Sequence, residues 1–171
     1  FGWRNVFWCA AVLSVFGLAF QVLTLPALPP NTTTRLKTLV DVAMRPGIAV
    51  GIISASAVYI VHVAYSTYLR PLLEGAAEAS SGSISLAFLM LGLGGMLGTA
   101  CSGPLMERSL RLTLTLMPVV LGLSGLALAF VTGAGARQAA LVLIWGAAYG
   151  AVPVAWSVWL TRMVPDQRET A

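Results

Sequence analysis

The chain alternates between long apolar runs and short polar segments. The apolar runs cover residues 7–25, 47–68, 83–105, 112–131 and 139–160. Each is close to the about 20 residues that a helix needs to cross the ~30 Å hydrocarbon layer of a bilayer. Backbone polar groups in lipid must be satisfied within a helix or a closed barrel. The pattern therefore predicts an all-α membrane protein with five transmembrane helices.

The polar segments between the runs contain helix-ending signals. Pro26, Pro29 and Pro30 end the first run, because proline cannot continue a helix. The segment from Thr34 to Ala43 predicts a short amphipathic helix lying on the membrane surface. Loops are expected at residues 72–82, 106–111 and 133–135, and a charged tail is expected after the fifth run.

Basic residues are distributed unequally between the two predicted sides of the membrane. The richer side holds Arg35, Lys37, Arg45, Arg108, Arg111, Arg162 and Arg168, and the poorer side holds Arg4, Arg70 and Arg137. Positive charge marks the cytoplasmic side. We therefore expect a multi-pass protein of the cell inner membrane, with the amino end of the chain outside and its carboxy end in the cytoplasm.

The amino-acid composition also indicates that the chain lies in a lipid bilayer. The chain is 58% hydrophobic and 9% charged, against about 25% charged residues in soluble domains. Its positive charges fall between spans, so we expect no nucleic-acid partner. Cys9 and Cys101 form no CxxC pair, and we expect neither a metal nor a cofactor. Because the first residue is Phe1, we expect the chain to be a fragment.

The second apolar run contains His62, the only histidine in the chain. Placing an ionisable side chain within a membrane span costs free energy, so His62 is a candidate functional residue. Tyr59, His62 and Ser66 lie at i, i+3 and i+7, so they share one helix face. Such a face suits a polar, aromatic solute, and the imidazole could also carry protons. The alternative is a single interhelical hydrogen bond with a packing role. Tyr65 and Tyr68 fit an interfacial aromatic belt.

The fifth run contains an aromatic stripe. Trp145, Tyr149 and Trp156 lie at i, i+4 and i+11, and Trp159 extends the stripe. Such rings can stack a nucleobase, although they could equally face lipid or pack. Pro153 is expected to bend this helix.

The third run is rich in glycine. Gly94, Gly98 and Ser102 stand four residues apart, as do Gly95, Thr99 and Gly103. Small residues at this spacing allow two helix backbones to approach closely.

The loop after the third run resembles a motif of the major facilitator superfamily. The sequence from Gly103 to Arg111, GPLMERSLR, is similar to the second copy of that superfamily's cytoplasmic loop motif, G-x-L-x-D-R-x-x-R. Glu107 replaces the usual Asp, and Arg108 and Arg111 are present. The resemblance implies a gating role for Gly103, Glu107, Arg108 and Arg111. The alternative is a solvated loop whose arginines only set topology.

Segments at the ends of the predicted helices narrow the resemblance to one branch of this superfamily. GWRNVF at residues 2–7, RPG at 45–47, TYLRP at 67–71 and VPVAWS at 152–157 resemble the purine ribonucleoside exporters of the drug:proton antiporter-like branch. The resemblance implies a twelve-helix bundle, of which this chain supplies about the sixth to tenth helices. Residues 1–27 would then be the last helix of the N-terminal half, 28–46 the cytoplasmic connection, and 47–171 part of the C-terminal half.

The implied activity is transport and not enzymatic catalysis. The expectation is efflux of small polar solutes, purine ribonucleosides above all, by proton-coupled alternating access. The implied partners are the solute, protons, the lipid bilayer and the remaining helices of the transporter. Sugar or drug efflux by the same superfamily is the nearest alternative, and a non-transporting membrane scaffold is an alternative of another class.

Overall fold

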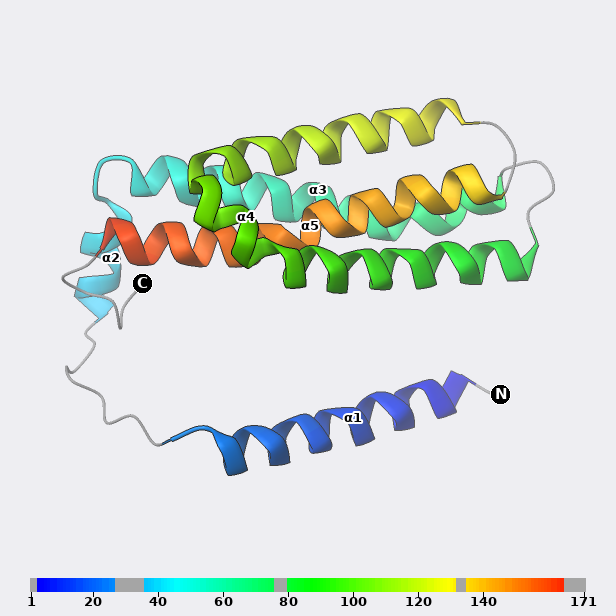
Figure 1. The fold of residues 1–171 in the computed structure, drawn as a ribbon, viewed down its shortest axis with the longest axis horizontal. Helices are drawn as coiled ribbons and strands as arrows, with labels where there is room; N and C mark the ends of the chain where they lie inside the picture. Colours follow the sequence, from blue (N-terminus) through cyan, green and yellow to red (C-terminus); the bar gives the residue numbers. More distant parts are fainter. Residues whose placement is uncertain (1–2, 27–35, 76–79, 132–134, 165–171) are drawn as a thin grey trace. The chain divides into compact units, whose positions relative to one another are not determined.

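The structure is a computed structural model that describes residues 3–26, 36–75, 80–131 and 135–164. Within these ranges the chain is helical and contains no strand, as the apolar pattern predicts (Figure 1). The helices are α1 (Trp3–Thr24), α2 (Leu36–Ala43), α3 (Ile48–Glu74), α4 (Ser81–Phe130) and α5 (Ala136–Met163). The predicted all-α fold class is confirmed.

The chain divides into two compact units, residues 1–33 and 34–171. The first unit contains α1, whose residues from Arg4 to Leu25 are exposed along the whole helix. The second unit contains the other four helices. The assignment of residues 1–27, 28–46 and 47–171 to parts of a larger transporter stays a prediction.

Four helices, α1, α3, α4 and α5, are long and apolar enough to cross a membrane. α4 has 50 residues, and a straight helix of that length would measure about 75 Å, more than twice the hydrocarbon thickness. α4 is not straight, however, and Figure 1 shows its two arms running in opposite directions.

The bend in α4 lies at Ser109, whose backbone is extended with φ −167° and ψ 109°. The Ser109 hydroxyl accepts a hydrogen bond from the Leu112 N–H at 3.2 Å, as a helix N-cap does. The arms 81–108 and 110–130 correspond to the third and fourth predicted spans. The predicted loop at 106–111 is wrong in extent, because the helix continues through Arg108 and resumes directly after the capping serine.

α2 is joined to α3 by a tight turn at Gly47, where φ is +88°, a conformation that glycine adopts without strain. The predicted amphipathic helix is present from Leu36, and Thr34 and Arg35 lie outside the described residues. Val42 is buried in a cluster with Ile48 and Val164. α2 therefore packs where α3 begins and α5 ends, and its position on the membrane surface stays a prediction.

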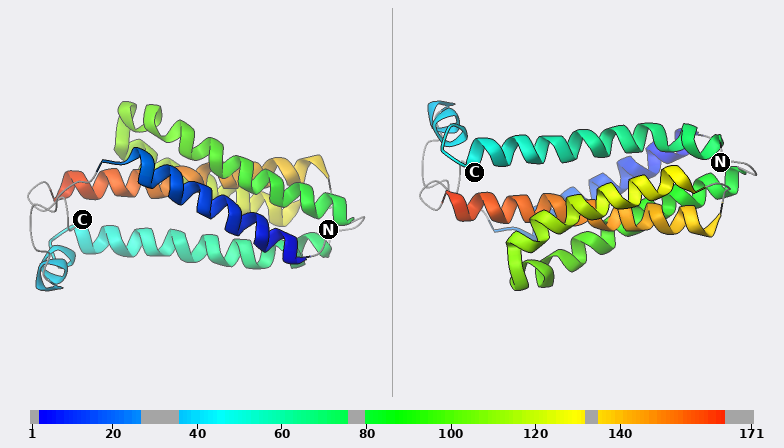
Figure 2. Two further views of the ribbon diagram at one scale, coloured as in Figure 1. Left: turned by 90° about the horizontal axis from the view of Figure 1, so that it is seen from below. Right: turned by 90° about the horizontal axis from the view of Figure 1, so that it is seen from above.

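α3 and α5 are antiparallel, as the two views in Figure 2 show. At the opposite end from the Ile48–Val164 contact, Leu69 and Leu73 of α3 pack with Val142 of α5. The antiparallel arrangement groups the basic residues by end. Arg45 and Arg162 lie at one end of this helix pair, and Arg70 and Arg137 lie at the other.

The first arm of α4 packs directly on the backbone of α5. A Cβ atom on Gly98 would overlap the carbonyl of Ala147, and one on Gly150 would overlap the carbonyl of Gly95. The Thr99 hydroxyl lies 3.0 Å from the Gly150 carbonyl oxygen on the other helix. The predicted close approach is confirmed. We call this contact, centred on Gly94, Gly98, Gly146 and Gly150, the glycine interface.

Candidate solute site between α3 and α5

Between the aliphatic contacts at the two ends, aromatic rings join α3 to α5. Tyr59, His62 and Tyr65 project from α3, and Trp145 and Tyr149 project from α5. The spacing of three residues on α3 and four on α5 places each set on one helix face. We call these five residues the aromatic interface.

His62 lies at the centre of the aromatic interface. Its ring stacks on the Tyr149 ring with 3.3 Å between ring centroids and 2° between planes. The Trp145 indole N–H donates to His62 Nδ1 at 3.3 Å, and the Ser66 hydroxyl lies 3.4 Å from Nε2. Both ring nitrogens and one ring face of His62 therefore have neighbours, on two different helices.

Trp145 is held from several directions and is only 3% exposed. The Tyr65 ring stacks on it at 3.8 Å with 6° between planes, and Gly125 and Leu121 of the second α4 arm lie against it. The prediction that Tyr65 belongs to an interfacial belt is wrong, because its ring packs on another helix instead of facing outward. Tyr68, by contrast, is 69% exposed.

A cavity of about 310 Å³ lies beside the aromatic interface, between the first half of α3 and the last half of α5. Tyr59 lines it from α3, and Pro153, Trp156 and Trp159 line it from α5. Tyr59 is 40% exposed and meets the Tyr149 ring edge-on with 6.0 Å between centroids. The cavity therefore has an accessible ring on each side, and Tyr59 links it to the His62 cluster.

Trp159 packs against the start of α3 where both helices line the cavity. The Trp159 ring occupies the space beside Gly51, so that a Cβ atom there would overlap it. Trp159 also meets the Trp156 ring edge-on, with 5.2 Å between centroids. Two cavity hydroxyls, those of Ser157 and Thr161, donate to carbonyl oxygens of their own helix.

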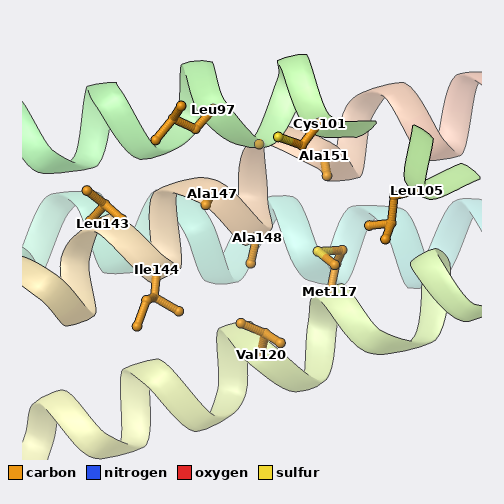
Figure 3. Close-up of a pocket in the computed structure, with 11 residues that line it drawn as sticks. Leu97, Cys101, Leu105, Met117, Val120, Leu143, Ile144, Ala147, Ala148 and Ala151 are labelled. Carbon is orange, nitrogen blue, oxygen red and sulfur yellow. The ribbon is translucent and has the colours of Figure 1, made fainter. Parts of the chain in front are cut away.

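A second pocket, of about 290 Å³, lies between α5 and the two arms of α4 (Figure 3). Its 11 lining residues are all apolar or cysteine, and include Leu97, Cys101, Met117 and Ile144. It offers no hydrogen-bonding partner of the kind that orients a polar solute in a binding pocket. We therefore take the ring-lined cavity as the candidate site.

The residues of the predicted gating loop flank the α4 bend. Glu107, Arg108 and Arg111 are exposed, and within the described ranges no ion pair joins the carboxylate to either arginine. Gly103, one turn before Glu107, has open space where a Cβ atom would lie. This group is separate from the aromatic interface, and its gating role stays a prediction.

The structure thus brings five of the six predicted solute-binding residues into one set of neighbours. They are Tyr59, His62, Ser66, Trp145 and Tyr149. Trp156, the sixth, lines the adjoining cavity. The sequence reasoning missed the cross-helix role of Tyr65, although its spacing of three from His62 places both on one face.

Among the described residues, no group of three metal-ligating side chains is present.

Several apolar spans joined through a polar, aromatic contact define a multi-pass membrane protein. Comparison with protein families narrows the class: the family model of the Major Facilitator Superfamily matches residues 1–171. The chain belongs to this superfamily.

Its relatives include efflux pumps. The chain is similar to the purine ribonucleoside efflux pump NepI of Salmonella paratyphi C (strain RKS4594) and to that of Salmonella typhi, at 35% identity over 170 residues in each case. Identity to NepI of Salmonella enteritidis PT4 is 36% over 171 residues. These matches cover 99% of this chain and 43% of each relative, so the chain spans less than half of their length. No solved structure matches it.

Proposed function

We propose that this chain forms part of an efflux transporter for purine ribonucleosides, with its solute path between α3 and α5. The observation that carries the proposal is the ring-lined cavity between two membrane-spanning helices, which the Tyr59 and Tyr149 rings connect to His62. A purine ring needs flat surfaces on which to stack, and a ribose needs hydrogen-bonding partners. Tyr59 and Trp156 supply accessible rings, while His62 and Ser66 supply the polar groups.

The mechanism in this proposal is proton-coupled alternating access, in which two halves of a twelve-helix protein rock about a midplane site. The remaining helices would cover the open side of the cavity. Glu107, Arg108 and Arg111 would form ion pairs when the cytoplasmic side closes. Arg45 and Arg162 lie at the same end of the α3–α5 pair, which supports a cytoplasmic position for that end and for the carboxy end of the chain. Arg70 and Arg137, at the opposite end, would then lie on the outer side of the membrane.

The test is uptake of radiolabelled inosine into inside-out vesicles that contain the full-length transporter, driven by a proton gradient. We expect uptake to collapse when the gradient is abolished, and excess unlabelled adenosine to compete. The His62→Ala variant is expected to lose most of the uptake, because it removes the polar centre of the aromatic interface. Thermal unfolding in detergent checks that this variant is folded.

A matched control is Phe130→Ala, since Phe130 lies at the end of α4 and is 78% exposed. It is expected to retain uptake. If the folded, intact protein takes up no inosine but does take up labelled sugars or cationic drugs, the nucleoside assignment is wrong. Absence of gradient-driven flux across the whole solute panel would favour the scaffold alternative.

A further inference from the structure

Trp145 is nearly fully buried and cannot offer its ring to a solute, yet its one polar atom is directed at His62 Nδ1 on the neighbouring helix. An indole N–H can only donate a hydrogen bond. The atom within reach of this N–H is His62 Nδ1, which accepts a hydrogen bond only when it is unprotonated. In a neutral imidazole the other nitrogen then carries the hydrogen, which places an N–H donor at Nε2.

We infer that Trp145 is a positioning residue, which fixes His62 as the Nε2-protonated tautomer and so presents an N–H donor to the solute path. The Ser66 hydroxyl, 3.4 Å from Nε2, is the acceptor for this N–H when no solute is bound. Tyr149, stacked on the imidazole, holds the plane of the ring. The part of the inference that concerns the solute rests on the proposed function, whereas the tautomer does not.

The groups around His62 favour this assignment. The side chains that reach it from α3 and α5 are Ser66, Trp145 and Tyr149, and none of them is a carboxylate. A doubly protonated imidazole would turn its Nδ1–H toward the Trp145 N–H, leaving two donors in contact in a low-dielectric setting. Trp145 is itself fixed by the Tyr65 ring and by Gly125, so the indole cannot turn away without losing that packing.

The direct test is nitrogen NMR of the full-length transporter labelled with 15N-histidine, with the His62 signals identified by their absence in His62→Gln. We expect Nε2 to give a protonated, pyrrole-type signal and Nδ1 an unprotonated, hydrogen-bonded pyridine-type signal. In Trp145→Phe, which keeps a ring against Tyr65 but lacks the N–H, the Nδ1 signal is expected to shift to the position of a free pyridine-type nitrogen. Trp156→Phe, on the same helix, is the control and is expected to leave both signals unchanged.

A protonated Nδ1 in the unmodified protein would overturn the inference, and so would unchanged His62 signals in a folded Trp145→Phe variant. Neither result depends on transport, so failure here is distinguishable from failure of the nucleoside assignment.

Transport kinetics provide a second test of the donor at Nε2. Trp145→Phe is expected to raise the KM for inosine about threefold, the size expected for one interhelical hydrogen bond in a membrane. His62→Gln keeps a donor near the Nε2 position and is expected to retain more uptake than His62→Asn. Adding Trp145→Phe to His62→Gln is expected to change KM no further. An equal loss in both single His62 variants, or additive effects in the double variant, would contradict the positioning role.

Discussion

α5 contacts its two neighbours in physically different ways. Against α4 it presents Gly146 and Gly150, and the backbones approach so closely that no side chain fits between them. Against α3 it presents Trp145 and Tyr149, whose rings fill the space between the helices. In this backbone contact each glycine opposes a particular backbone segment of the other helix. The contact with α3 is made by side chains, and in the proposed function the solute path follows this side of α5.

The largest effect is expected from a side chain placed in the glycine interface. Gly98→Leu would overlap the Ala147 carbonyl, and we expect a loss of about 3 kcal/mol or more in stability, the upper range for overpacking. Thermal unfolding of the full-length transporter in detergent measures the loss. Gly92→Leu is the matched control, because a Cβ atom at Gly92 meets nothing within 4 Å. Equal stability of the two variants would show that this interface is not a tight backbone contact.

The second largest effect is expected from removing a ring of the cavity, and it should alter solute binding and not folding. Trp156→Leu removes one ring from the cavity wall, and loss of a base-stacking ring costs about 1–3 kcal/mol. We therefore expect the KM for inosine to rise about tenfold, with thermal unfolding little changed. Phe130→Leu provides the control for loss of an exposed ring. An unchanged KM in the folded Trp156→Leu variant would remove this residue from the solute site.

The smallest effect is expected for the hydrogen bond across the glycine interface. Thr99→Val keeps the shape of the side chain but removes the donor to the Gly150 carbonyl. Such bonds in membranes contribute about 0.6 kcal/mol on average, so a small loss of stability is expected. Thr115→Val is the control, since the Thr115 hydroxyl donates only to carbonyls of its own helix. Identical unfolding of the two variants would show that the backbone packing suffices without this bond.

The sequence predicted the helices well, because apolar length alone determines which segments can cross a membrane. It placed a loop around the α4 bend, because charged residues at Glu107, Arg108 and Arg111 suggested solvent. A single extended residue, Ser109, is enough for the turn. A serine preceding an apolar run is an N-cap signal and could have located the bend.

The candidate site was only partly predictable, for a geometric reason. Helical spacing shows which residues share a face, and this placed His62 beside Ser66 and Trp145 beside Tyr149. It does not show which helix lies opposite that face. The stacking of Tyr65 on Trp145 and the position of Trp159 over Gly51 depend on the antiparallel packing of α3 and α5, which only the three-dimensional structure provides.

We propose that the solute path follows the aromatic interface and not the apolar pocket between α4 and α5. This proposal is tested most directly by photolabelling the full-length transporter in membranes with an azido-purine ribonucleoside, followed by mass spectrometry of the labelled peptides. Excess inosine serves as the competitor. We expect competed label on Tyr59 or Trp156. Competed label on pocket residues such as Leu97 or Met117, with none on α3, would contradict it.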